Sequence, residues 1–69
     1  MSDHVYRLTE VVGSSTTSVD DAVRAAVTKA AETVRNIEWF QTSEIRGMVS
    51  EGQVQYFQVT MKIGFRVED

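Results

Sequence analysis

Cysteine is absent from this sequence, and histidine occurs once, at His4. Without cysteine the chain can form neither disulfides nor thiolate metal sites, and this composition suits a reducing compartment. One histidine close to the N-terminus is also too few for a structural zinc site. We therefore expect a cytoplasmic protein without a metal site.

Surplus positive charge and long apolar runs are also missing. The net charge is -3, whereas binding to nucleic acid needs a basic surface. No apolar run approaches the roughly 20 residues that span a bilayer, and residues 1–4 lack the basic-then-apolar pattern of a signal peptide. These absences predict a soluble single domain over residues 1–69, with neither nucleic acid nor membrane as a partner.

The shortness of the chain, 69 residues, limits the core that it can build. Chains of this size bury only about 60% of their unfolded surface, so their stability is marginal unless a disulfide, a metal or self-association adds to it. The composition argues against a disulfide and against a metal site. We therefore expect the protein to associate with itself.

One strand and one helix are predicted in the first half of the chain. The stretch "HVYRLTEVVG", rich in β-branched residues and ended by Gly13, predicts the strand. After a polar loop, Ser18 is placed to cap a helix whose first turn holds Asp20 and Asp21. Small apolar residues then recur every three or four positions over residues 19–37, which predicts a helix of about five turns with one apolar face.

Two long strands are predicted after the helix, on either side of Glu51-Gly52, because the apolar period falls to two and a polar residue followed by glycine is a hairpin signal. The fold class is therefore α+β, with element order β-α-β-β. We expect a three-stranded antiparallel sheet wrapped on one helix.

The pairing of the two long strands decides where the only tryptophan points. With a two-residue turn at 51–52, Ser50 lies opposite Gln53 and Trp39 lies opposite Gly64. The helix side would then hold Phe40, Met48, Phe57, Val59, Met61, Ile63, Phe65 and Val67. The other side would hold Ile37, Trp39, Gln41, Ile45, Tyr56, Gln58, Thr60, Lys62 and Arg66, with Tyr6 or Leu8 from the first strand.

This pairing gives the uncovered side a mixed patch around Trp39, of the kind that marks an interface or a ligand site. Gln58 would lie opposite Ile45, six residues from Trp39 or roughly 20 Å along the strand. One small ligand could not reach both, so either the register differs or the site joins two subunits. A bulge at Gly47 would instead turn Trp39 toward the helix.

Each candidate residue also has an ordinary interpretation. Trp39 could anchor the core or an interface without a ligand, and Gln58 could be a solvated strand residue. Arg46 and Arg66 could lie on the surface or in salt bridges. No nucleophile with its base, no phosphate-binding glycine loop and no metal cluster is recognisable.

Three segments together resemble the dodecin family of bacteria: "RNIEWFQTSEIRG", the turn "SEGQ" and "YFQVTMKIGFRVE". The similarity extends from "VYRLTEVVGSS" to Glu68. It implies a hollow homododecamer that binds flavins, FMN or riboflavin, in pairs near its two-fold axes. Some bacterial members also bind coenzyme A at subunit contacts, but no short motif places that site here.

The same resemblance assigns roles to four residues. Trp39 corresponds to the tryptophan that stacks on the isoalloxazine ring, and Gln58 to the glutamine that hydrogen-bonds its pyrimidine edge. Arg46 corresponds to an arginine on the phosphate side of the flavin. Arg66 corresponds to one near the site or in a salt bridge between subunits.

The leading hypothesis is a non-catalytic flavin protein that serves storage, buffering or photoprotection. The alternative is an oligomeric structural or interaction module that binds coenzyme A or another metabolite. A flavoenzyme ranks below both, because the sequence offers no evident proton donor.

Overall fold

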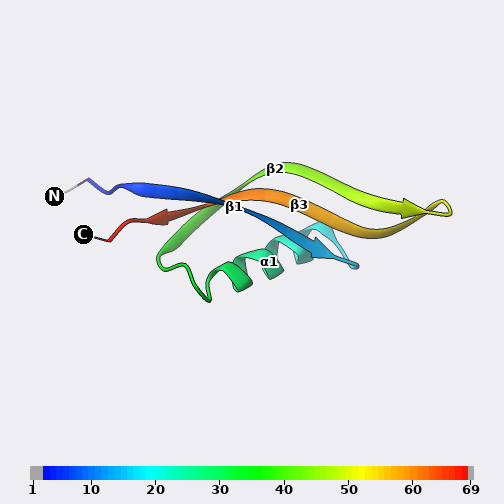
Figure 1. Ribbon diagram of the computed structural model, residues 1–69, viewed down its shortest axis with the longest axis horizontal. Helices are drawn as coiled ribbons and strands as arrows, with labels where there is room; N and C mark the ends of the chain where they lie inside the picture. The colour runs from blue at the N-terminus through cyan, green and yellow to red at the C-terminus, as the bar shows by residue number, and fades with distance from the viewer. Residues whose placement is uncertain (1–2, 69) are drawn as a thin grey trace.

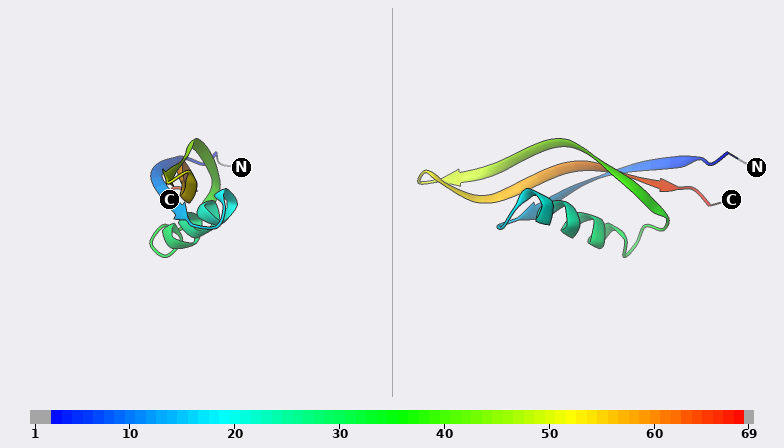
Figure 2. Two further views of the ribbon diagram at one scale, coloured as in Figure 1. Left: turned by 90° about the vertical axis from the view of Figure 1, so that its right-hand side faces the viewer. Right: turned by 180° about the vertical axis from the view of Figure 1, so that it is seen from behind.

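The computed structural model describes residues 3–68, which form three strands and one helix. Along the chain these are β1 (Tyr6–Ser15), α1 (Val19–Ala30), β2 (Ile37–Ser50) and β3 (Gln53–Arg66). The sheet is antiparallel with order β1-β3-β2, and α1 lies along one of its faces (Figures 1 and 2). The predicted β-α-β-β fold is confirmed.

The helix begins where the sequence predicts but is shorter. Ser18 is extended, with φ of -164°, and its Oγ accepts a hydrogen bond from the Asp21 amide at 3.1 Å, which confirms the cap. α1 ends at Ala30 after 12 residues instead of about five turns. The chain must turn back to start β2 beside β3, and Asn36 takes the left-handed conformation there, with φ of 64°.

The core is a thin layer between the helix and the central strand. Ala22 and Ala26 of α1 pack against Val59, Met61 and Ile63 of β3. These five are the buried apolar residues of the described chain. Such a small core leaves much of the apolar surface without cover.

Gly13 of β1 lets the helix approach the sheet closely. It lies opposite Val59, so it is on the helix side of the sheet. A Cβ atom at this position would overlap the carbonyl oxygen of Ala22 and come within 2.9 Å of the Ala26 Cβ. Only glycine therefore fits at this contact without a shift of α1.

The predicted register is correct at both ends of the hairpin. Glu51 and Gly52 have φ angles of 53° and 73°, as in a two-residue type I′ turn. Ser50 pairs with Gln53 and, at the far end, Trp39 pairs with Gly64.

Between these ends the register shifts by one residue. β2 has an extra residue, Ser43, between Thr42 and Glu44, and β3 has an extra residue, Gln55, before Tyr56. The two bulges compensate each other, so between Trp39 and Ser50 only residues 44–48 of β2 are displaced relative to the prediction. The bulge considered at Gly47 does not occur.

Irregularities in β2–β3 pairing place three residues on the opposite side from the one predicted. Ile45 lies opposite the buried Val59 and so on the helix side, and Met48 lies opposite Tyr56, on the side away from the helix. A further irregularity separates Ile37 from Trp39, and Ile37 packs against the core. A slip of one position exchanges the two faces of a strand, which explains all three errors.

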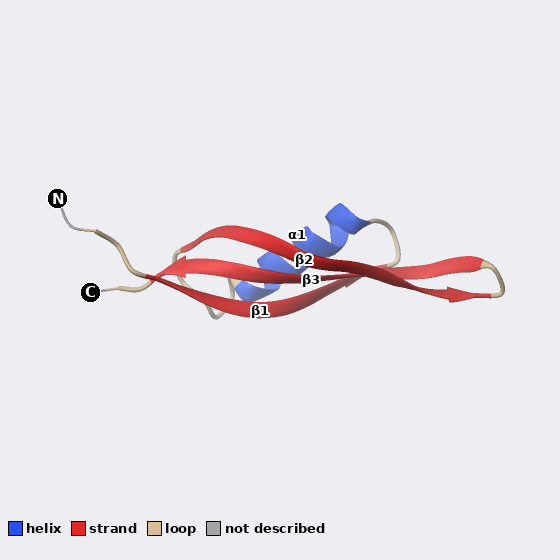
Figure 3. Ribbon diagram, turned by 90° about the horizontal axis from the view of Figure 1, so that it is seen from above, coloured by secondary structure: helices blue, strands red, loops and turns tan. Residues whose placement is uncertain are grey.

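The molecule is long and narrow. Its extents are 56 × 20 × 14 Å, and its radius of gyration is 14.4 Å, compared with about 11 Å for a compact chain of this length. The end of the β2–β3 hairpin projects beyond both β1 and α1 (Figures 1 and 3). Val49 and Val54 near its tip are 63% and 57% exposed. Within residues 3–68, no helix is long and apolar enough to cross a membrane.

Candidate functional site

Trp39 lies on the face of the sheet opposite α1, which we call the open face. It pairs with Gly64, the neighbour of the buried Ile63, so strand alternation directs Trp39 and Ile63 to opposite sides. A Cβ atom on Gly64 would overlap the six-membered ring of the indole, which therefore rests on the Gly64 backbone. The prediction that Trp39 points away from the helix is confirmed.

Two side chains of β1 complete the surroundings of this indole. The Tyr6 ring meets Trp39 edge-on, with centroids 5.1 Å apart and planes at 61°. Leu8 pairs with Gly64 from the other edge of the strand and is 55% exposed. We call Trp39, Tyr6, Leu8 and Gly64 the Trp39 platform. The indole keeps 40% of its surface exposed, so the platform can accept a further planar group.

Gln58 and Arg46 form a second group on the same face. They are directly opposite each other in the register, and Arg46 Nε donates a hydrogen bond to Gln58 Oε1 at 3.0 Å. Gln58 is half-buried, and Arg46 is exposed. The displaced register creates this pair, because the predicted pairing would have placed Ile45 opposite Gln58.

These two groups are far apart within one chain. Gln58 precedes Gly64 by six residues on β3, which corresponds to roughly 20 Å along an extended strand. The corrected register does not bring Gln58 closer to Trp39. Of the two explanations that the sequence left open, only a site that joins subunits can place both residues on one small ligand.

Arg66 lies at the Trp39 end of the open face. It is two residues beyond Gly64 and pairs with Tyr6. Its half-buried side chain lines a cleft of about 470 Å³, together with Arg7, Arg35 and Asn36. The structure therefore brings Arg66 close to the Trp39 platform and leaves Arg46 at the Gln58 end.

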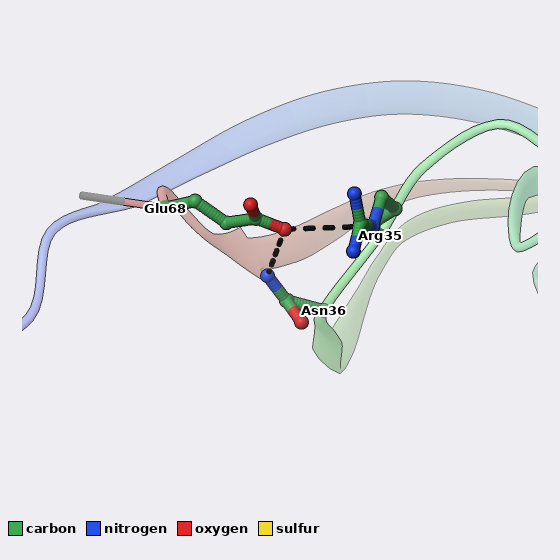
Figure 4. A network of polar contacts seen from close by, with 3 residues as sticks. All are labelled: Arg35, Asn36 and Glu68. Carbon is green, nitrogen blue, oxygen red and sulfur yellow. Dashed lines mark hydrogen bonds and ion pairs between the residues drawn. The ribbon is translucent and has the colours of Figure 1, made fainter.

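A carboxylate already occupies part of this cleft. Glu68 accepts a hydrogen bond from Asn36 Nδ2 at 3.2 Å and forms an ion pair with Arg35 Nε at 3.4 Å (Figure 4). Within residues 3–68, the ion pairs are this one and Lys29–Glu32, and neither includes Arg66 or Arg46. The expected salt-bridge role of Arg66 has no partner within the described part of the chain.

Among residues 3–68, the one carboxylate with a clearly shifted pKa lies outside both groups. The Ser18 side chain lowers the pKa of the Asp20 carboxylate, helped by the backbone amide of Asp20. This carboxylate belongs to the helix cap. Among residues 3–68, no group of three His, Cys, Asp or Glu side chains is arranged to hold a metal ion.

Sequence reasoning missed two contacts of the site. Tyr6 or Leu8 was expected on the open face, but the edge contact of Tyr6 with Trp39 was not, although the pairing of β1 with β3 would have revealed it. The Arg46–Gln58 hydrogen bond depends on the paired bulges at Ser43 and Gln55, for which the sequence carries no distinct signal.

Comparison with known proteins places this geometry in a family. The family model described as Dodecin matches residues 5–68. The dodecin of Thermus thermophilus is 40% identical over 65 residues, which cover 94% of each chain.

Solved structures agree with this match. The structure of dodecin from Streptomyces coelicolor has a TM-score of 0.93 at 52% identity and covers 100% of this chain and 99% of its own. Dodecin from Streptomyces davaonensis has the same TM-score at 44% identity, over 99% of this chain and 100% of its own.

Structures of T. thermophilus dodecin are also similar when an arginine is replaced by alanine, at either of two positions, or a tryptophan by phenylalanine. They are 37% identical to this chain and cover 97% of it and 98–100% of their own chains, with TM-scores of 0.91–0.92. The chain belongs to the dodecins, a family of small, non-catalytic flavin-binding proteins that are typically homo-oligomeric.

Proposed function

We propose that this protein binds FMN or riboflavin without catalysis and serves flavin storage, buffering or photoprotection. Trp39 stacks on the isoalloxazine ring at a subunit interface of a homododecamer. The observation that carries this proposal is the partly exposed indole supported from below by the Gly64 backbone. An indole in that position has one side held by the sheet and the other side free for a flat ring.

Stacking and burial together account for useful affinity. An aromatic pair contributes about 0.5–1.5 kcal/mol beyond the area that it buries. Each square ångström of apolar ring surface removed from water adds roughly 25 cal/mol. Tyr6 holds the edge of the indole, so little freedom of the platform is lost when a ligand binds.

The distance between Trp39 and Gln58 supports a site shared by subunits. If both residues touch one isoalloxazine ring, they come from different copies, because one copy separates them by roughly 20 Å. The elongated shape and the five buried apolar residues also favour assembly. Folding and assembly then form one concentration-dependent equilibrium.

The substituted T. thermophilus dodecins support the choice of residues. The tryptophan and the two arginines that were replaced have the same spacing along their chain as Trp39, Arg46 and Arg66. Together with Gln58, these are the residues that we propose for the flavin site.

The test is titration of FMN with purified protein, followed by flavin fluorescence and by absorption near 450 nm. Excited flavin in contact with an indole is quenched by rapid electron transfer, so bound FMN should be dark. Trp39→Ala should weaken binding at least about tenfold, a loss of about 1.4 kcal/mol. Phe40→Leu is the matched control, because Phe40 is the next residue, is similarly exposed and faces the helix side.

The mass of each variant in solution separates loss of the ligand from loss of the assembly. Undiminished flavin fluorescence at micromolar wild-type protein would refute the proposal. An assembly that purifies colourless and takes up no flavin would favour the alternative, an interaction module that binds coenzyme A or another metabolite.

A further inference from the structure

The hydrogen bond between Arg46 and Gln58 fixes the orientation of an amide that faces the ligand site. Arginine carries only donors, so the Gln58 atom 3.0 Å from Arg46 Nε must be the carbonyl oxygen Oε1. The Nε2 group of Gln58 then points away from Arg46. Because Arg46 occupies one acceptor position of the Gln58 carbonyl, the amide has its two N–H donors left to bind a ligand.

The fold holds this pair in register. Arg46 and Gln58 are direct cross-strand neighbours, whose Cβ atoms lie about 4.5–5.5 Å apart. The bulges at Ser43 and Gln55 together bring Arg46 to this face, and the Ser43 hydroxyl donates to the Thr60 carbonyl at 3.2 Å. No ion pair within residues 3–68 includes Arg46, so no carboxylate there draws the guanidinium away from Gln58.

We propose that Arg46 is a positioning residue that determines whether Gln58 presents hydrogen-bond donors or acceptors to the flavin. By holding Oε1 of Gln58, it directs the Nε2 donors toward the carbonyl oxygens and ring nitrogen acceptors on the pyrimidine edge of the isoalloxazine ring. This inference rests on the proposed flavin function. It assigns Arg46 an indirect role, through Gln58, in place of the phosphate contact that the family resemblance implies.

The pyrimidine edge of a flavin carries both hydrogen-bond donors and acceptors. Its two carbonyls and a ring nitrogen accept, whereas its imide N–H donates. A freely rotating amide could match either group, but an amide held by Arg46 matches the acceptors. The Arg46–Gln58 pair should therefore favour rings that have hydrogen-bond acceptors facing Gln58, whether or not the ligand carries a phosphate.

The first experiment compares FMN with riboflavin, which lacks the phosphate. Both ligands are titrated by fluorescence quenching with wild type, with Arg46→Ala and with Lys62→Ala, a control that removes another positive charge from the open face. Loss of one positioned hydrogen bond should weaken both flavins by the same factor, about fivefold. Weaker binding of FMN alone, or no change for either flavin, would overturn the proposal.

The second experiment uses Gln58→Glu, which is nearly the same shape. This variant keeps an oxygen for Arg46 but replaces the Nε2 donors by an acceptor. It should lose as much riboflavin affinity as Gln58→Ala at neutral pH. Retained affinity in Gln58→Glu would show that the ligand uses the acceptor and would overturn the proposal.

The outcomes separate this inference from the proposed function. If wild-type protein binds no flavin, the proposed function fails. If wild type binds flavin with unchanged mass and the variants behave otherwise than stated, only the role of Arg46 fails.

Discussion

Gly64→Ala tests whether the Trp39 platform depends on a missing side chain. Gly64 does not have a positive φ, so alanine is compatible with the backbone there. The added Cβ would overlap the indole, and even Cδ2 of Trp39 would be only 2.5 Å away. Ordinary carbon contacts are about 3.5–4.0 Å, so the ring must retreat by at least about 1 Å.

The size of the effect follows from this displacement. Extra atoms in a packed site typically cost about 1–3 kcal/mol of folding free energy, and the lower end applies because Trp39 is partly exposed and can move. For the ligand, loss of stacking geometry worth about 0.5–1.5 kcal/mol weakens flavin binding roughly two- to twelvefold.

Two assays report on this change. Trp39 is the only tryptophan, so intrinsic fluorescence measures its environment directly, with or without flavin. We expect a red-shifted emission in Gly64→Ala because the indole lifts off the backbone into water. Titration with FMN should show the weaker binding, while the mass in solution stays unchanged.

A double-mutant cycle with Trp39→Ala gives the decisive comparison. Without the indole there is room for the new methyl group, so Gly64→Ala should change stability by less than about 0.5 kcal/mol in that background. An equal cost with and without the indole would refute the idea that Gly64 exists to support Trp39. An unshifted emission spectrum would do the same.

Two further predictions concern the helix, and both are measured as free energies of unfolding at fixed protein concentration. Ser18→Ala should cost about 1 kcal/mol at neutral pH through loss of the cap. Ser18 also lowers the pKa of Asp20 in the folded state. The stabilising interaction between Ser18 and the Asp20 carboxylate is therefore fully present above the ordinary pKa of Asp20 and is lost as the pH falls through the lowered pKa. The difference from wild type should therefore narrow in acid, and a constant difference would contradict this linkage. Gly13→Ala should cost about 1–3 kcal/mol, since its Cβ would meet the helix backbone, whereas Ser14→Ala on the opposite face should change little. Equal effects of these two substitutions would show that the close approach of the helix is not needed.

Those parts of the fold that depend on strong periodic signals could be predicted from the sequence. The Ser18 cap, the helix face with Ala22 and Ala26 and the turn at Glu51 each combine a local motif with an apolar pattern. The outward direction of Trp39 followed from the turn because the two bulges cancel over the length of the hairpin.

The middle of the hairpin could not be predicted, for a physical reason. Residues 42–44 are all polar, and so are Gln53 and Gln55 on either side of Val54, so an extra residue in either segment buries no polar group and exposes no apolar one. Alternation fixes register only where one face is buried. Ile45 and Met48 were therefore assigned to the wrong sides, and Ile45 instead of Arg46 was expected opposite Gln58.

The two unpaired residues of the hairpin, Ser43 and Gln55, make it tolerant of length changes at these points. Deleting Ser43 would leave Thr42 opposite Met61 and Glu44 opposite Thr60, so Arg46 would stay opposite Gln58 and Trp39 opposite Gly64. Relatives that lack one residue between Thr42 and Glu44 could therefore keep the same residues on the open face. When such sequences are aligned, a gap of one position at this point is compatible with unchanged contacts to a ligand.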